Sequence, residues 1–136
     1  MTAHGCAFLV GVLCFVASSP PAEACRCVEP SAAKAYALGD VVVVGRVESV
    51  EKHGDLFVAT LAVERAWKGD VANRIRIVFG GTCSFVLETL ERYLLYPTRA
   101  GDGSYGIRRC RGDQLYGRAA RPLAWLGKHG KASLVR

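Results

Sequence analysis

The cysteines constrain the fold of this 136-residue chain more than any other feature of its sequence. Four of them follow residue 24, namely Cys25, Cys27, Cys83 and Cys110. An even number of cysteines in a small exported domain predicts disulfide bonds, and four cysteines allow three pairings. A bond between Cys25 and Cys27 would close a very small, strained ring, so we expect each of them to pair with Cys83 or Cys110, in either combination. Each bond would close a loop of more than fifty residues and contribute roughly 4 kcal/mol in the chain-entropy model.

Two other uses of a Cys-x-Cys pair compete with structural disulfides. A zinc site is disfavoured because common zinc-binding motifs separate their cysteines by two to four residues. A redox enzyme is less well supported because the surrounding sequence lacks the βαβ pattern of thioredoxin-like proteins. Structural disulfides are therefore the preferred interpretation, and a redox site stays a minor alternative.

The first 24 residues predict export from the cytoplasm. Residues 6–17 form a run of twelve apolar or small residues, which is too short to cross a bilayer as a helix. Two serines and two prolines follow, and residues 22–24 (Ala-Glu-Ala) form a small-x-small cleavage pattern. We therefore expect residues 1–24 to be a signal peptide and the mature chain to begin at Cys25. The protein would be secreted, or periplasmic or on the cell surface in a Gram-negative host, and would not span the membrane.

The charge of the chain is unevenly distributed. Nine Lys or Arg but only two acidic residues lie in residues 99–136, whereas nine of each balance in residues 25–98. A basic segment on an exported protein suits contact with an anionic surface or polysaccharide, although an ordinary solvated face has the same composition. Nucleic acid is not an expected partner outside the cell. The arginines that would form the basic surface are Arg108, Arg109, Arg111, Arg118 and Arg121.

The hydrophobic pattern after the cysteine pair predicts a β-rich domain. Residues 32–38 lie between Pro30 and Gly39, which are typical of the two ends of a short helix. Continuous or alternating apolar residues predict five strands. The strands are expected at residues 41–50, 57–64, 74–79, 92–96 and 104–110. Five antiparallel strands with an early helix favour a small Greek-key barrel, whose closure would protect the edges of its long strands.

This pattern divides the chain into three parts. The signal peptide at residues 1–24 precedes a barrel domain at residues 25–112. A basic C-terminal tail occupies residues 113–136, and residues 122–127 in it could form a short helix.

The sequence offers no catalytic constellation. After residue 24 it contains two histidines, His53 and His129, and neither has a Cys, His or carboxylate at a metal-ligand spacing. Motifs for a serine nucleophile, a zinc protease or a phosphate-binding loop are missing. Glu88 and Glu91 lie three residues apart, but a pair of surface carboxylates is common and does not predict a catalytic dyad. We therefore expect a monomeric binding protein without a cofactor rather than an enzyme.

The order of these motifs resembles the tissue inhibitors of metalloproteinases (TIMPs) and the wider netrin-like (NTR) module, in a short single-domain form. The likeness covers residues 25 to about 112. It rests on the Cys25-Arg26-Cys27 start, residues 40–47 and 63–69, Cys83, residues 91–96 and Cys110. The resemblance implies an OB-like five-stranded barrel with the disulfides Cys25–Cys83 and Cys27–Cys110.

The resemblance also implies an inhibitory mechanism. In that family the free α-amine and the carbonyl oxygen of the first cysteine chelate the catalytic zinc of a target protease, at the coordination position that a protease leaves open. Here that residue is Cys25, which would contact only the zinc of a target. Arg26 would enter the specificity pocket of the protease, whereas animal inhibitors usually have a small Thr or Ser at this position. Because burying a guanidinium is costly unless a carboxylate pairs with it, the expected target is a protease with an acidic pocket. The surface that would contact the protease, which we call the wedge, would comprise Cys25, Arg26, Cys27, Thr82, Cys83 and Ser84.

Two hypotheses of different classes follow. The first is a secreted metalloprotease inhibitor that acts through Cys25. The second is an NTR-like extracellular binding or adhesion module that uses the basic surface on anionic partners. Acylation, lipidation or extension of the N-terminus at Cys25 would abolish chelation and favour the second.

Overall fold

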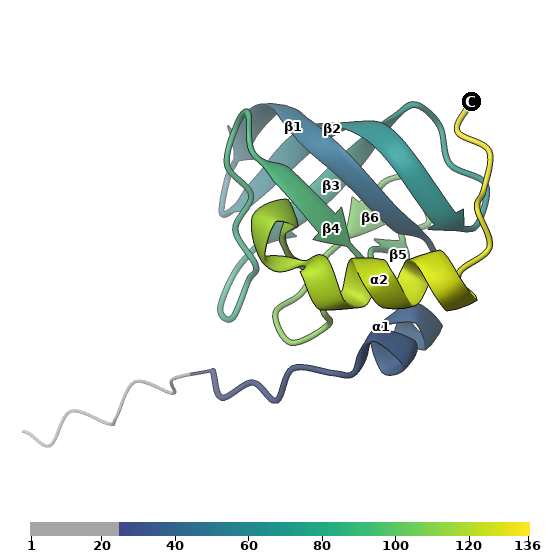
Figure 1. The fold of residues 1–136 in the computed structure, drawn as a ribbon. Helices are drawn as coiled ribbons and strands as arrows, with labels where there is room; N and C mark the ends of the chain where they lie inside the picture. Colours follow the sequence, from purple (N-terminus) through teal and green to yellow (C-terminus); the bar gives the residue numbers. More distant parts are fainter. Residues whose placement is uncertain (1–24) are drawn as a thin grey trace, which may run out of the picture.

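The computed structural model describes residues 25–136 (Figure 1). The predicted signal peptide at residues 1–24 lies outside the described residues. No helix within residues 25–136 has the length and apolar character needed to cross a membrane. The elements are α1 (Ala32–Leu38), β1 (Val42–His53), β2 (Leu56–Lys68), β3 (Arg74–Gly80), β4 (Arg92–Leu95), β5 (Thr98–Arg99), β6 (Tyr105–Gly106), β7 (Gln114–Leu115), the 3-10 helix η1 (Tyr116–Arg118) and α2 (Ala120–His129).

The strands form one curled sheet with the order β5-β6-β3-β2-β1-β4-β7. The long strands β1 and β2 form an antiparallel hairpin, with β3 beside β2 and β4 beside β1, also antiparallel. The register of the hairpin shifts along β1 after Val42, Val44 and Val47. Such bulges increase the bend and twist of a strand. The sheet therefore curls into an OB-like half-barrel (Figure 1).

The start of β1 is buried on both of its faces because two apolar clusters flank it. Val43 and Val47 belong to the cluster inside the curled sheet, together with Leu61. Val42 and Val44 belong to a second cluster on the other face of the sheet, where α1 and α2 lie side by side (Figure 1). Burial decreases towards the end of β1. The continuous valine run therefore marks the part of β1 that is buried on both of its faces.

The predicted fold class, a disulfide-stapled β-rich OB-like fold with one or two short helices, is confirmed, but the sheet has seven strands rather than the predicted five and curls into a half-barrel. The predicted helix at residues 32–38 is α1, and the first four predicted strands correspond to β1–β4. The strand predicted at residues 104–110 is much shorter, because only Tyr105–Gly106 forms β6, and β6 pairs with β3 in parallel rather than antiparallel. Beyond the buried Ile107 the chain leaves the sheet towards Cys110, which is bonded to Cys27.

Residues 113–136 pack onto the same sheet. β7 pairs with β4, and Ala119 and Leu126 are fully buried in the second cluster. Ser133 forms an isolated bridge with Ala66 near the end of β2. The helix predicted at residues 122–127 is α2, which is longer and spans Ala120–His129. The segment expected as a tail is thus part of the folded unit.

Candidate functional site

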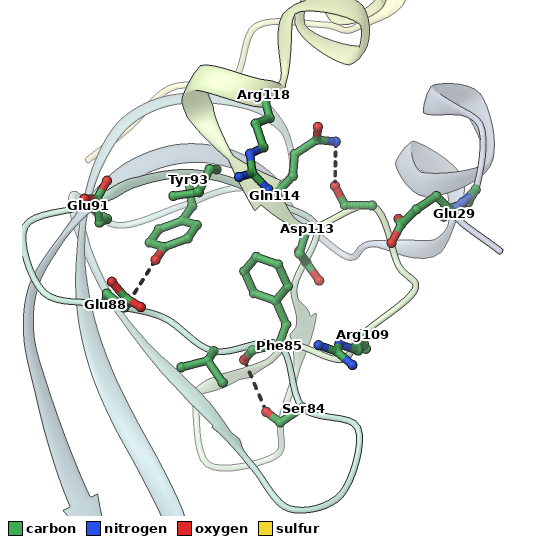
Figure 2. A pocket seen from close by; sticks show the side chains of 14 residues that line it. Glu29, Ser84, Phe85, Glu88, Glu91, Tyr93, Arg109, Asp113, Gln114 and Arg118 are labelled. Atoms are coloured by element: carbon green, nitrogen blue, oxygen red, sulfur yellow. Dashed lines mark hydrogen bonds between the residues drawn. The ribbon is translucent and has the colours of Figure 1, made fainter. Parts of the chain in front are cut away.

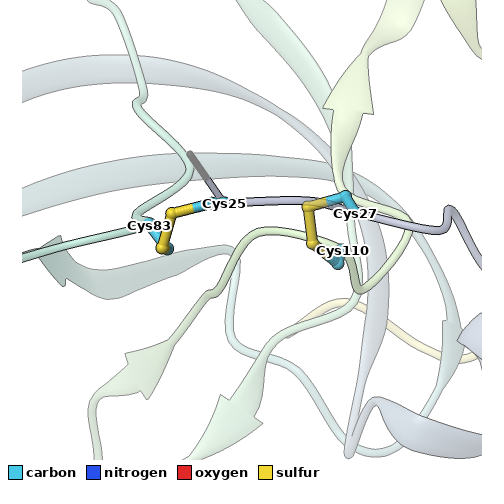
Figure 3. Close-up of a disulfide and its surroundings, with 4 residues drawn as sticks. All are labelled: Cys25, Cys27, Cys83 and Cys110. Carbon is cyan, nitrogen blue, oxygen red and sulfur yellow. A yellow bond between two sulfur atoms is a disulfide. The ribbon is translucent and has the colours of Figure 1, made fainter. Parts of the chain in front are cut away.

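Two disulfides fasten the N-terminal segment, residues 25–30, to the rest of the fold (Figure 3). Cys25 is bonded to Cys83, with 5.6 Å between their Cα atoms, and Cys27 is bonded to Cys110, with 5.2 Å. This is the pairing that the family resemblance implies, and it is one of the two combinations that spacing alone left open. Each bond reaches a different loop, so the segment lies alongside both.

The side chains next to the two bonded cysteines are exposed. Arg26 lies between the two bonds and faces solvent. Val28, directly after them, is 91% exposed. Cys25 and Cys27 themselves are half-buried. The segment therefore combines a fixed backbone with side chains that are free to contact a partner.

The loop between β3 and β4 carries the other three residues of the predicted wedge. The N–H of Gly80 donates to Oγ of Ser84 at 2.8 Å, which closes a tight turn around Thr82 and Cys83. The carbonyl of Cys83 accepts a hydrogen bond from the N–H of Arg109 at 3.4 Å, so this loop is joined to the one that holds Cys110. The structure therefore brings the six wedge residues into one region.

Both cysteines that anchor the segment have a left-handed backbone conformation. The φ angle is +64° at Cys83 and +67° at Cys110, values that residues other than glycine rarely adopt. Such conformations cost of order 1–3 kcal/mol each and cluster at functional sites. The disulfides and the hydrogen bond between the loops hold this strained arrangement in place.

A groove of about 650 Å³ lies beside the N-terminal segment (Figure 2). We call it the Asp113 groove. It is bounded by the N-terminal segment, the β3–β4 loop, β4 and the chain around β7. Its lining residues are 29, 30, 84–86, 88, 91, 93, 109, 112–115 and 118.

Asp113 is the buried carboxyl group of this groove, with 6% of its surface exposed. Its Oδ1 accepts a hydrogen bond from the backbone N–H of Tyr96 at 2.7 Å, whereas its Oδ2 has no hydrogen-bond partner among the described residues. Burial raises the pKa of Asp113 to about 7, and the hydrogen bond from the N–H of Tyr96 and the nearby charge of Arg111 only partly oppose this. Burial and the charge of Asp113 together raise the pKa of Tyr96 to about 12.

The predicted basic surface is divided among several elements. Arg108, Arg109, Arg118 and Arg121 are exposed and Arg111 is half-buried. Arg109 and Arg118 line the Asp113 groove from opposite sides, among exposed carboxylates (Figure 2). Arg108 lines another hollow, beside β5 and β6, and Arg121 lies in the first turn of α2. The groove itself is therefore of mixed charge.

The other titratable candidates do not form a metal-binding group. Within residues 25–136, no three His, Cys, Asp or Glu side chains are placed to hold a metal ion. His53 lies 3.4 Å from a carboxylate oxygen of Glu51, and His129 stacks on Trp125 in α2. Glu88 and Glu91 both lie along the Asp113 groove. The zinc predicted to contact Cys25 would belong to a target protease.

Asp113 is the candidate that sequence reasoning missed. It stands at the predicted boundary between the barrel and the tail, and its neighbours in sequence do not mark it as buried. The one available signal is that Asp113 and Asp102 are the only acidic residues in residues 99–136. Its hydrogen-bond partner Tyr96 and the groove residues Glu29 and Pro30 are distant from it in sequence.

No protein-family model matches the chain, and no curated protein matches it at a significant level.

Proposed function

We propose that the protein is a secreted TIMP-like inhibitor of zinc metalloproteases, which chelates the zinc of its target through the α-amine and carbonyl oxygen of Cys25. The observation that carries this proposal is the pair of disulfides, which hold Cys25 and Cys27 against two loops while Arg26 and Val28 face solvent. The TIMP-like and NTR-like order of the sequence motifs supports the same proposal.

The chelation is chemically sound once a signal peptidase has freed the amine of Cys25. A catalytic zinc has three protein ligands and an open fourth position, normally taken by water. The amine nitrogen and the carbonyl oxygen of one residue can close a five-membered ring on that metal and displace the water. An α-amine has a pKa near 8, so binding needs to remove only a proton that is easily lost.

The disulfides reduce the cost of docking. Ordering three free residues would cost roughly 3–6 kcal/mol in backbone conformational entropy. In residues 25–27 this cost is met during folding, because the bonds to Cys83 and Cys110 restrict the segment before any partner arrives. The strained φ angles at Cys83 and Cys110 are consistent with loops shaped for contact rather than for stability.

Arg26 would set the specificity of the inhibitor. Its guanidinium is exposed in the free protein and would lose water in a protease pocket. Burying it costs several kcal/mol unless a carboxylate of the target pairs with it. We therefore expect preference for a protease whose pocket carries an acidic residue, and we expect Arg26→Thr to move that preference towards apolar pockets.

The test compares two forms of the protein that differ by one residue. One begins at Cys25, and the other carries an additional alanine before it, which blocks the chelate and leaves the disulfides intact. Both are assayed on a panel of zinc metalloproteases with a quenched fluorescent peptide. Intact mass and circular dichroism verify the N-terminus, the two disulfides and the fold of each form.

The form that begins at Cys25 should inhibit at least one protease, and the added alanine should weaken inhibition at least about 100-fold, or about 2.7 kcal/mol. Equal inhibition by the two forms would refute chelation by Cys25. Lack of inhibition by both forms across the panel would refute the function itself.

A second candidate function is an extracellular NTR-like binding module for anionic surfaces. Its supporting observation is that Arg108, Arg109, Arg118 and Arg121 are exposed and form no ion pair with another described residue. Binding to immobilised heparin should then fall steeply with salt, because exposed charges are screened within about 8 Å at physiological ionic strength. Weak binding that does not change with salt would exclude this function.

A further inference from the structure

The carboxyl group of Asp113 is incompletely satisfied in a buried position. Its Oδ1 is held by the backbone N–H of Tyr96, but its Oδ2 has no partner among the described residues, and none of their ion pairs includes this side chain. A buried polar group without a partner costs free energy, and a buried charge costs more. Figure 2 shows this carboxyl group directed into the groove. Because Oδ2 is covered in the free protein, a ligand that enters must displace a lining side chain to reach it, and the carboxyl group can then accept its hydrogen bond.

Two aromatic rings line the groove near this carboxyl group (Figure 2). Phe85 and Tyr93 pack edge to face, with ring centroids 5.8 Å apart. The hydroxyl of Tyr93 accepts a hydrogen bond from the N–H of Glu88 at 3.0 Å, which fixes the orientation of its ring. Aromatic rings favour apolar chains, and their faces attract cations by roughly 0.5–2 kcal/mol.

Acidic side chains outnumber basic ones around the groove. Glu29, Glu88 and Glu91 line it in addition to Asp113, against two arginines, Arg109 and Arg118. Lining by carboxylates on more than one side favours a positively charged ligand over an anion.

We propose that the Asp113 groove binds a lysine side chain presented by a partner protein, with its ammonium donating to Oδ2 of Asp113 and its methylene chain lying along Phe85 and Tyr93. The raised pKa of Asp113 reflects the same unpaired burial, and a cation bound at Oδ2 would lower it.

Lysine fits this acceptor better than arginine does. Because Tyr96 already occupies Oδ1, Asp113 offers one free oxygen. A guanidinium is strongest when it forms two parallel hydrogen bonds with both oxygens of a carboxylate. An ammonium is a compact point charge and needs only one.

The groove adjoins the segment that is proposed to contact a protease. Glu29 and Pro30 line it and follow the disulfide-bonded Cys27 closely, and Ser84, which also lines it, is next to Cys83. A partner that covers the N-terminal segment can thus reach the groove with the same surface. The lysine site goes beyond the proposed inhibition and does not require it, since any partner protein that docks on this face could supply the lysine.

The experiment uses the folded chain with both disulfides formed and the probe Nα-acetyl-lysine methylamide. Carboxyl carbon NMR follows the titration of Asp113 with and without the probe, and amide shifts report affinity. The norleucine and arginine analogues test the ammonium, and spermidine tests a free polyamine as an alternative source. The variant Asp113→Asn keeps an oxygen for the N–H of Tyr96, and Asp55→Asn in the exposed β1–β2 turn is the charge-matched control.

Several charged and titratable groups surround Asp113, and the carboxyl carbons among them appear in the same spectra. They are Glu29, Glu88, Glu91, Tyr93, Tyr96, Arg109, Arg111 and Arg118. We expect saturable binding of the lysine probe, at least tenfold weaker binding to Asp113→Asn than to Asp55→Asn, and weaker binding of the two analogues. At saturation the midpoint of Asp113 should fall by at least about one pH unit, which corresponds to tenfold preference for the ionised form.

Three results would overturn the proposal. The first is equal binding of the lysine and norleucine probes. The second is a titration midpoint of Asp113 that the probe leaves unchanged, or one already near 4 in the free protein, as expected if Arg109 or Arg111 pairs with it. This titration uses the wild-type chain, so it remains a valid test even if Asp113→Asn fails to fold. The third is tighter binding of spermidine than of the lysine probe, which would assign the groove to free amines.

Discussion

Replacing Asp113 by asparagine should remove the pH dependence that this buried carboxyl group imposes on stability. The folded protein holds the proton of Asp113 with a pKa of about 7, whereas the unfolded chain holds it with the ordinary value of 3.8. Between these two values the folded state binds more protons than the unfolded state, so the free energy of unfolding falls as pH rises. The contribution of Asp113 is complete below pH 3.8 and is lost above pH 7.

The size of the effect follows from the two pKa values. Their separation of about three pH units corresponds to roughly 4 kcal/mol, since one unit is worth about 1.4 kcal/mol. The asparagine of Asp113→Asn cannot ionise and still offers an oxygen to the N–H of Tyr96, although its buried amide adds a cost of about 1–3 kcal/mol that does not depend on pH. We therefore expect the variant to gain about 3 kcal/mol relative to wild type between pH 4.5 and pH 8.

Urea unfolding at constant ionic strength, followed by tryptophan fluorescence, measures this difference. Trp67 is buried in the second apolar cluster, so its fluorescence changes when that cluster unfolds. Because each comparison is made at one pH, titration of the other groups cancels from the difference between variant and wild type. The control Asp55→Asn should differ from wild type by a constant amount. If the difference in stability between Asp113→Asn and wild type is also constant with pH, the raised pKa of Asp113 is refuted. If the variant instead loses stability relative to wild type as pH rises, the pKa of Asp113 is lowered rather than raised.

Two further predictions concern the fold. Nζ of Lys68 donates to the carbonyls of Tyr36 and Gly39 at 2.8 and 2.6 Å. Lys68→Met should therefore lower the free energy of unfolding by about 2 kcal/mol, and a loss below about 0.5 kcal/mol in urea would show that these bonds do not secure the end of α1. A Cβ at Gly45 would lie 2.6 Å from the carbonyl oxygen of Ala62, so Gly45→Ala should lower the melting temperature and destabilise by about 2 kcal/mol. Gly127→Ala in α2, where a Cβ meets nothing within 4 Å, should instead stabilise by about 0.5–1 kcal/mol, and equal effects of the two changes would contradict the close approach at Gly45.

Local patterns predicted the helix and the long strands because their signals are contained in short windows of sequence. Pro30 and Gly39 bracket α1, and the alternation of apolar and charged residues in β3 follows the period of a strand with one buried face. The shortened strand at residues 104–110 shows the limit of such patterns. Buried Tyr105 and Ile107 produce the alternation, but the extent of pairing depends on β3 and on the disulfide that draws Cys110 away.

The sequence by itself determined the β-rich class and the presence of disulfides, because these depend on residue type and local order, whereas the residues proposed for the wedge around Cys25 came from the family resemblance. Only the tertiary structure decided three other features. It chose between the two remaining cysteine pairings, packed residues 113–136 onto the sheet, and buried Asp113 beside the N-terminal segment. All three depend on contacts between segments that are distant in the chain, and the proximity of such segments is created only when the sheet curls and the core closes.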